Sequence, residues 1–334
     1  MAVRLTFKLL EKPSHDSLVV AYMDNIVASA KVVQRVLPMG PSGIEIMDKT
    51  LLHLAAQEDP ALARALPKEV DNVLLIEFDG FNDSEVAEPA QTVERMLKGE
   101  GITDRVHIAL QPSEKKGFWA VRKAAVPILY RLKGKKKILA LIEDAAVPVH
   151  HLVVYFEGVY DLLNRYRVRF VVYGHIAKGL LHTRPLLDLR DPRDVGLLKT
   201  IADQFYDLVS GLGGSVSGEH GDGRLRSCYI KKSYPGIYPL FIEIKKLLDP
   251  DGVFNPEIIT HHDPNQMKQT LRFGADYRSR SLGDEKIRWN NGFADAVEVC
   301  HGCGKCTTVT TATRMCPDCP IASMRPEPIL RLNA

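Results

Sequence analysis

The chain has 334 residues, of which 45% are hydrophobic and 25% are charged, and its formal net charge is +3. This length and composition are typical of a globular protein that forms one large domain or two smaller ones. The weak charge and the 7% of aromatic residues argue against a nucleic-acid partner. The sequence also contains no apolar stretch near the roughly 20 residues that a transmembrane helix requires.

Strand-like and helix-like segments alternate along most of the chain. Alternating or β-branched apolar runs predict strands at residues 3–10, 17–23, 42–47, 72–78, 105–110, 138–142 and 168–175. Apolar residues at helical spacing predict helices at residues 25–37, 48–57, 83–98, 113–130, 148–166, 192–212 and 238–248. The order fits either a parallel α/β sheet or ferredoxin-like units with an antiparallel sheet. A hairpin in the middle of the chain favours the second, an α+β fold.

That hairpin is the segment from Tyr173 to His182. If Lys178-Gly179 forms its two-residue turn, His175 and His182 lie directly opposite each other, with Cβ atoms about 5 Å apart. Two imidazoles at that distance can bind one metal ion, although the same spacing also fits a structural histidine pair.

A glycine-rich segment at residues 213–223 supplies the residue types that a metal site would need beside the hairpin. It contains Glu219 and His220 among its glycines. Glycines let a backbone approach a ligand closely or adopt positive φ. Glu219 can complete a site of two histidines and one carboxylate with an open position, and His220 can act as a general base. The alternative is a surface turn with ordinary polar residues.

Five of the six cysteines lie in the last 35 residues. The spacing C-x2-C-x2-C-x9-C-P predicts one [4Fe–4S] cluster on Cys300, Cys303, Cys306 and Cys316, because thiolates are soft ligands that suit iron–sulfur clusters. In the alternative, Cys303, Cys306, Cys316 and Cys319 bind one zinc ion. Thiols clustered in this way, without a disulfide framework, predict a reducing compartment, the cytoplasm.

Several motifs in a fixed order carry a family resemblance. They are GIEIMD at 43–48, FWAVRK at 118–123, EDAAVP at 143–148, GHI at 174–176, LHTRP at 181–185, GGSVSGEHGDG at 213–223 and LDPDGVFNP at 248–256. Together they resemble the C-terminal (cap) domain of FAD-linked oxidases of the vanillyl-alcohol-oxidase class. This class includes D-lactate, glycolate and D-2-hydroxyglutarate dehydrogenases. The cysteine segment resembles the long members, in which a flavin half is joined to an iron–sulfur half.

The resemblance implies three parts. Residues 1–258 are expected to form an α+β, ferredoxin-like cap whose antiparallel sheet is flanked by helices. Residues 259–292, which are polar and charged, are expected to be a linker. Residues 293–334 are expected to form a small helical iron–sulfur segment.

The same resemblance implies a metal site on His175, His182 and Glu219, for zinc or a similar divalent ion. The loop between the two histidines departs from the commoner family pattern, which makes the fold a firmer expectation than the metal.

The resemblance also implies catalytic roles. His220 is expected to take the proton of a substrate hydroxyl, and Arg122 to bind the substrate carboxylate. Asn255 is expected to approach the flavin ring. Arg184 stands where many relatives have asparagine, so it is either a second carboxylate clamp or a structural arginine.

These features predict the cap and iron–sulfur part of a flavin-dependent dehydrogenase of D-2-hydroxy acids. Hydride would pass to FAD, and electrons would leave through the cluster to an acceptor protein or a quinone, in the cytoplasm or at the membrane periphery through a complex. FAD is expected to be bound mostly by a separate domain or partner chain, because residues 1–100 contain no glycine-rich phosphate loop. The alternatives are a non-catalytic electron-relay or docking subunit and a zinc-binding tail.

Overall fold

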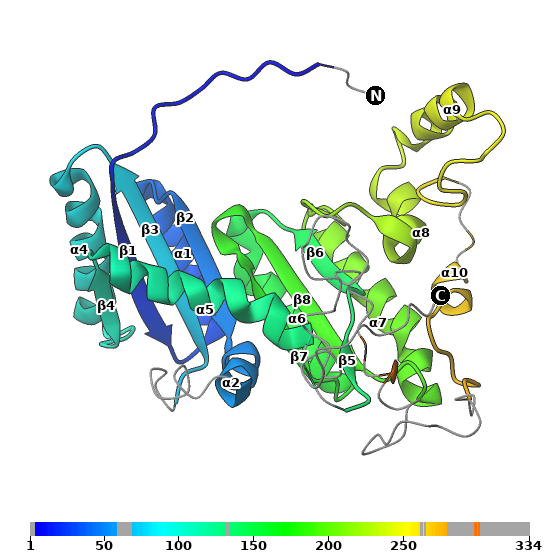
Figure 1. Cartoon of the computed structure of the whole chain (residues 1–334), viewed down its shortest axis with the longest axis horizontal. Coiled ribbons are helices and arrows are strands. Elements are labelled where there is room, and N and C mark those ends of the chain that lie inside the picture. Colours follow the sequence, from blue (N-terminus) through cyan, green and yellow to red (C-terminus); the bar gives the residue numbers. More distant parts are fainter. Residues whose placement is uncertain are drawn as a thin grey trace, which may run out of the picture.

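The structure is a computed structural model that describes residues 4–58, 69–130, 132, 134–260, 263, 265–278, 297, 298 and 300. The protein is built in layers, with one antiparallel sheet that has helices on both faces (Figure 1). The strand order is β4-β1-β3-β2-β7-β8-β5, and β6 also pairs with β8. Every strand pair among the described residues is antiparallel, which confirms the predicted α+β fold with an antiparallel sheet flanked by helices.

The strands are β1 (His15–Met23), β2 (Gly43–Asp48), β3 (Asn72–Gly80), β4 (Val106–Ala109), β5 (Lys137–Ile138), β6 (Ile142–Ala146), β7 (Phe170–His175) and β8 (Leu180–Leu187). The α-helices are α1 (Ile26–Val36), α2 (Lys49–Glu58), α4 (Asp83–Gly99), α5 (Pro112–Tyr130), α6 (Leu152–Arg165), α7 (Pro192–Gly211), α8 (Gly223–Ser233), α9 (Tyr238–Leu248) and α10 (Gln266–Gln269). The 3-10 turns are η1 (Leu37–Met39), η2 (Val149–His151) and η3 (Ile176–Lys178).

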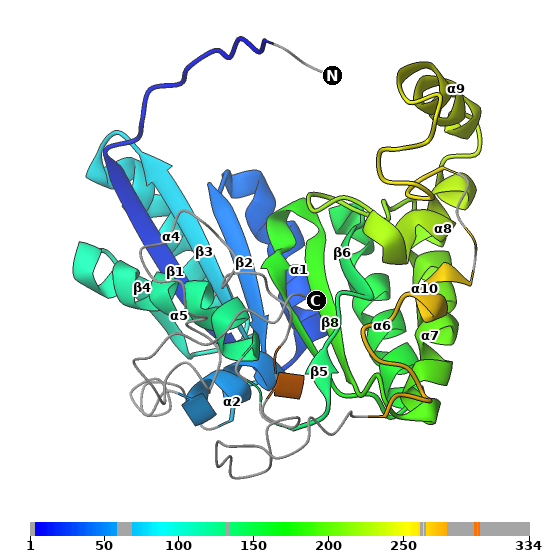
Figure 2. The same cartoon turned by 45° about the vertical axis from the view of Figure 1, so that its right-hand side comes forward.

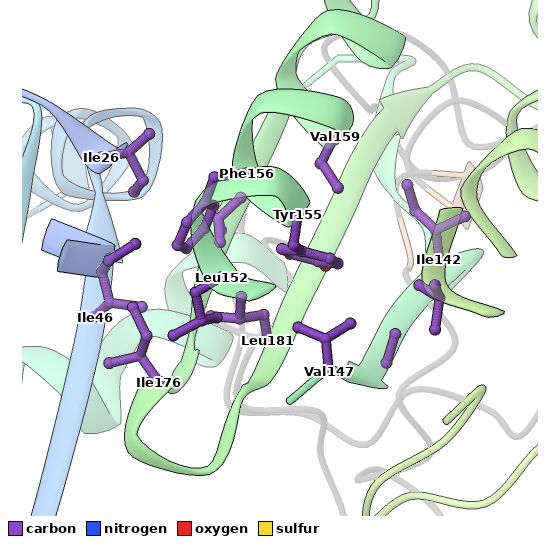
Figure 3. Packing of buried hydrophobic residues seen from close by; sticks show 14 of the residues in the cluster. Ile26, Ile46, Ile142, Val147, Leu152, Tyr155, Phe156, Val159, Ile176 and Leu181 are labelled. Carbon is purple, nitrogen blue, oxygen red and sulfur yellow. The ribbon is translucent and has the colours of Figure 1, made fainter. Parts of the chain in front are cut away.

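One face of the sheet is covered by α1, α4, α6 and α7. Figure 3 shows Phe156 of α6 toward Ile26 of α1 and Ile46 of β2, and Tyr155 of α6 above Leu181 of β8. These side chains are buried, so the apolar stripe of each helix faces the sheet. This layer forms the larger of the two main hydrophobic clusters.

The opposite face is covered by α2 and α5. Leu51 of α2 and Leu129 of α5 share a buried cluster with Val171, Tyr173 and Leu186 of the sheet. Because side chains alternate between faces along a strand, this cluster shows which residues of β7 and β8 share this face. His175 lies two residues after Tyr173 on β7, and His182 and Arg184 lie four and two residues before Leu186 on β8. These three residues therefore point to the same face as Tyr173 and Leu186, which α2 and α5 cover.

Most predicted elements lie within a few residues of the observed ones, but two predictions need correction and one helix was missed. Residues 4–10 form no strand: Leu9 and Leu10 are 89% and 85% exposed, and both edges of the neighbouring β1 are already paired with β3 and β4. The predicted strand at 138–142 is two short strands, β5 and β6, both paired with β8. Helix α8 was not predicted, because its polar sequence and initial glycine give little helical signal.

The far end of the structure carries an exposed helix. Figure 2 shows α9 at the end away from β1 and β4, joined to the rest through α8. None of the helices in the described ranges is both long and apolar enough to span a lipid bilayer.

A buried carboxyl group at the start of α2 gives the fold a testable pH dependence. Asp48 is 2% exposed and caps α2 by accepting a hydrogen bond from the backbone N–H of Leu51 at 2.9 Å. Burial raises its pKa to about 7, although backbone hydrogen bonds from Leu51 and Val172 oppose the rise. The folded state therefore binds this proton more tightly than the unfolded state, so the contribution of Asp48 to stability falls as pH rises from about 4 to about 7.

We expect Asp48→Asn to remove this fall of stability with rising pH, because asparagine does not titrate and still caps the helix. Relative to the parent chain, the free energy of unfolding of the variant should rise by about 2–3 kcal/mol between about pH 5 and about pH 8. Urea unfolding at the two pH values measures the difference. An equal pH dependence in both proteins would contradict it.

Candidate functional site

The histidines of β7 and β8 lie on one face of the sheet, but not in the predicted register. Tyr173 pairs with His182, and His175 pairs with Leu180, so the predicted direct pairing of His175 with His182 is wrong. The connection is the three-residue turn η3 followed by Gly179 with φ 66°, not a two-residue turn. A shift of two residues keeps both imidazoles on the same face, with ring centroids 6.0 Å apart.

Gly179 explains why the longer turn forms. A Cβ at this position would lie 1.8 Å from the carbonyl oxygen of Val147, and the φ is left-handed, so only glycine fits. Val147 in turn donates its N–H to the carbonyl of Gly179 at 3.0 Å. The turn is therefore fixed by a tertiary contact with the segment after β6.

Glu219 lies between the two histidines. Its Oε2 is 3.7 Å from Nε2 of His175, and its Oε1 is 3.2 Å from Nε2 of His182. Ligand atoms of a tetrahedral zinc ion with bonds of about 2.05 Å lie about 3.3 Å apart. The spacing between His182 and Glu219 is therefore that of two ligands of one metal ion, whereas the spacing between His175 and Glu219 is wider.

The buried histidine of this group is neutral at physiological pH. His182 is 3% exposed, and burial, aided by the nearby His220 and Arg184, lowers its pKa to about 3. Neutral imidazole is the form that binds metals. Its Nδ1 is buried and has no hydrogen-bond partner within the described part of the chain.

Glu45 binds the other histidine, His175, at the ring nitrogen that does not face Glu219. Its Oε1 contacts Nδ1 of His175, and its Oε2 accepts a hydrogen bond from Nε of Arg122 at 2.7 Å. Fixing Nδ1 directs Nε2 of His175 toward Glu219. A carboxylate on the second nitrogen of a metal-binding histidine is the usual way in which such a ring is oriented.

His220 contacts the same carboxylate from the solvent side. Its Nε2 is 2.9 Å from Oε1 of Glu219, and its ring stacks on that of His182 with centroids 5.0 Å apart. Ligand atoms of Asp144, His182, Glu219 and His220 all lie within 4.8 Å of one another. Among the described residues, the group that meets this limit thus contains His182, Glu219 and His220 but not His175.

Both arginines have carboxylate partners within the protein. Arg184 is 7% exposed and pairs with Glu143, whereas Arg122 pairs with Glu45. Their guanidinium carbons lie 5.8 and 5.1 Å from the ring centroid of Tyr173. The burial and pairing of Arg184 favour the structural one of its two predicted roles.

The remaining predicted residues lie away from this face or outside the described ranges. Asn255 is exposed on the loop after α9. The carbonyl of Cys300 accepts a hydrogen bond from Nη1 of Arg272 at 2.5 Å. The other predicted cluster ligands, Cys303, Cys306 and Cys316, fall outside the residues that the structure describes, as does Cys319.

Three acidic residues of the site were missed: Glu45, Glu143 and Asp144. They stood in the GIEIMD and EDAAVP motifs, which marked the resemblance but gave no role to single residues. Acidic residues inside otherwise apolar strands are the signal that could have identified them, because a buried carboxylate needs a partner.

Comparisons with known proteins agree with this fold. The family described as "FAD linked oxidases, C-terminal domain" matches residues 12–259. D-2-hydroxyglutarate dehydrogenase of Pseudomonas putida is 28% identical over 326 residues, which cover 94% of this chain and 32% of the relative. Glycolate oxidase subunit GlcD of Escherichia coli K12 is 30% identical over 259 residues, which cover 77% of this chain and 50% of the relative.

Solved structures show the same fold at low identity. A substrate-bound p-cresol methylhydroxylase has a TM-score of 0.54 at 15% identity, covering 78% of this chain and 54% of the other. A 4-ethylphenol oxidase from Gulosibacter chungangensis has a TM-score of 0.52 at 13% identity, covering 75% and 55%. The chain thus spans about one third to one half of the length of these curated relatives.

The Glu45–Arg122 pair makes a prediction about stability. The two side chains are only 10% and 14% exposed, so removing one charge leaves the other poorly solvated. We expect Arg122→Met to lower the free energy of unfolding by about 2–4 kcal/mol. Adding Glu45→Gln should restore about 1 kcal/mol or more. Urea unfolding of the single and double variants measures this coupling.

The exposed pair Arg165–Asp161 provides the control, because its side chains are 58% and 66% exposed. Arg165→Met should cost less than about 1 kcal/mol. Strictly additive effects of the Arg122 and Glu45 substitutions would show that the two side chains do not stabilise each other.

Proposed function

Because the chain belongs to the family of FAD-linked oxidase C-terminal domains, we propose that it forms the cap part of a flavin-dependent dehydrogenase of 2-hydroxy acids. The observation that carries the proposal is the meeting of His175, His182, Glu219 and His220 on one face of the sheet. D-lactate, glycolate and D-2-hydroxyglutarate are the substrates suggested by the names of the relatives.

The glycine-rich loop at residues 213–223 does not offer three of its central N–H groups to the phosphates of FAD. The glycine-rich loop would be the natural candidate, but the N–H groups of Gly218, Glu219 and His220 already donate to Asp144. We therefore assign most of the FAD contacts to a flavin-binding domain or partner chain, which would approach the open side of the site.

An apolar surface on α9 supports such a partner. Leu240, Ile244 and Leu247 are spaced along one side of the helix and are 51%, 46% and 80% exposed. Phe254, on the loop after α9, is 69% exposed. Contiguous exposed apolar side chains of this kind mark interaction surfaces. Asn255, next to Phe254, would reach the flavin only in the assembled enzyme.

The residues present fit a divalent metal, and we propose that His175, His182 and Glu219 hold it. The 3.2 Å spacing between His182 and Glu219 and the neutral state of His182 suit zinc or a similar ion, and His175, 3.7 Å from Glu219, would be the third ligand. Such an ion would act as a Lewis acid toward the oxygens of a 2-hydroxy acid. Glu45 keeps Nε2 of His175 turned toward that position.

His220 is proposed as the general base. Its side chain is 44% exposed, so a substrate can reach it, and its ring is held between His182 and Glu219. In this role it accepts the substrate hydroxyl proton, while FAD, when bound, accepts the α-hydrogen as hydride. The two transfers together convert the 2-hydroxy acid into a 2-oxo acid and leave one proton on His220.

Arg122 is proposed to bind the substrate carboxylate. Glu45 uses only Nε, so the two terminal nitrogens of Arg122 are not engaged by that bond. A guanidinium fork is suited to a carboxylate. Glu45 would then orient both Arg122 and His175, and so link substrate binding to the metal site.

Electron exit is proposed to run through a [4Fe–4S] cluster on Cys300, Cys303, Cys306 and Cys316 to an acceptor protein or quinone. The support is the cysteine spacing, and a [4Fe–4S] cluster would give a reduced flavin an exit for its electrons one at a time. Zinc on Cys303, Cys306, Cys316 and Cys319 is the alternative that metal analysis must distinguish.

Substitution of His220 tests the enzymatic role. In the complex with the flavin-binding polypeptide, His220→Asn should lower kcat for the best 2-hydroxy acid by about 10²–10⁴-fold, because the base that takes the hydroxyl proton is lost. Steady-state kinetics with an artificial electron acceptor measure it.

His150→Asn, at an exposed histidine of η2, is the matched control and should keep the parent rate. Full turnover by the His220 variant would leave the chain as a docking or relay subunit.

The cluster makes a separate prediction about iron. Chain purified without oxygen should be brown and hold about four iron atoms, and Cys303→Ala should lose them because the ligand set is broken. Cys228→Ala should keep them, since Cys228 lies half-buried on α8. Elemental analysis decides, and one zinc per chain without iron would contradict the cluster.

A further inference from the structure

The loop that carries Glu219 and His220 is fastened along β6. Ser215 and Ala146 exchange backbone hydrogen bonds of 2.8 and 3.1 Å, and Gly218 donates its N–H to the carbonyl of Asp144 at 2.8 Å. The packing is close at Gly218, where a Cβ would lie 2.4 Å from Cδ1 of Leu180 and would force that side chain to shift. The loop is therefore pressed onto the strand at a defined register.

The Asp144 side chain completes the attachment. Its Oδ1 accepts the N–H of Glu219 at 3.1 Å, and its Oδ2 accepts the N–H of His220 at 2.9 Å and the hydroxyl of Ser217. The residue is 0% exposed and has a left-handed φ of 69°. This conformation is uncommon outside glycine but is tolerated by aspartate and asparagine, and here it turns the carboxylate under the loop.

The charge of Asp144 is balanced from α8. Nη1 of Arg226 lies 3.8 Å from Oδ2 of Asp144 and donates to the carbonyl of Glu143 at 2.7 Å. Arg226 also donates from Nε to the carbonyl of Asp222 at 3.1 Å, at the end of the same loop. One buried ion pair thus joins β6, the loop and α8.

We propose that Asp144 is a positioning residue that sets the places of Glu219 and His220 by binding their backbone N–H groups. Its carboxylate lies near the metal-capable atoms, but the hydrogen bonds from Ser217, Glu219 and His220 occupy it, so we assign it to the loop and not to the metal. The assignment rests on the proposed function only for what Glu219 and His220 then do.

The test is Asp144→Asn in the whole chain, since asparagine tolerates the same φ and removes the charge and one acceptor oxygen. Hydrogen exchange read at single residues should show amide protection of Glu219 and His220 falling by about 10- to 100-fold, as expected for hydrogen bonds to a charged group. Protection in β1 and β3 should stay unchanged. Ser217→Ala, which removes one donor and keeps the carboxylate, should cause a smaller loss at the same two amides.

Asp194→Asn is the matched control. Asp194 is 1% exposed and accepts the N–H of Asp188 at 2.9 Å, at the start of α7. This variant should leave the protection of Glu219 and His220 unchanged. The proposal is overturned if Asp144→Asn leaves these two amides fully protected, or if Asp194→Asn exposes them equally.

A second readout is Mn²⁺ binding followed by electron paramagnetic resonance, because this hard ion avoids the cysteine thiolates. Asp144→Asn should weaken binding by about 10-fold or more, and Asp194→Asn should not. Unchanged Mn²⁺ affinity in Asp144→Asn would contradict the positioning role. A parent chain that binds no Mn²⁺ would count against the metal site of the proposed function, while the exchange result alone would still decide the role of Asp144.

Discussion

Antiparallel pairing of β2, β7 and β8 is the constraint on which the candidate site depends. Alternation along these strands sends one set of side chains into the hydrophobic layer under α1 and α6, and the other set toward α2 and α5. Glu45, His175 and His182 all belong to the second set. A one-residue slip of either pairing would turn a ligand into the core, whereas the two-residue shift seen in the hairpin leaves the face unchanged.

The buried charges in and around the candidate site are arranged in compensated pairs. Arg122 is matched by Glu45, Arg184 by Glu143, and Arg226 by Asp144. Each pair is mostly buried. Such pairs add little to the net stability of the fold, but each one fixes the position of the side chains that form it. The neutral His182 and the exposed Glu219 have no place in these pairs, so a bound ligand could interact with both.

Much of the fold and part of the site could be predicted from the sequence. Periodicity located most strands and helices, and the motif with Glu219 and His220 indicated the chemistry. The hairpin register could not be predicted, because the turn is set by the contact of Gly179 with Val147 and not by local preference. The role of Asp144 was equally hidden, since its partners lie 73 to 76 residues further along the chain. The predicted strand at residues 3–10 failed because alternation alone does not supply a partner strand.

The central claim is that His175, His182 and Glu219 form one metal site. Pulsed electron paramagnetic resonance of the Mn²⁺-loaded chain, with ¹⁵N-labelled histidine, tests it most directly. Two directly coupled imidazole nitrogens are predicted, falling to one in His175→Ala and in His182→Ala. A spectrum without histidine coupling, or one that neither substitution changes, would contradict the claim.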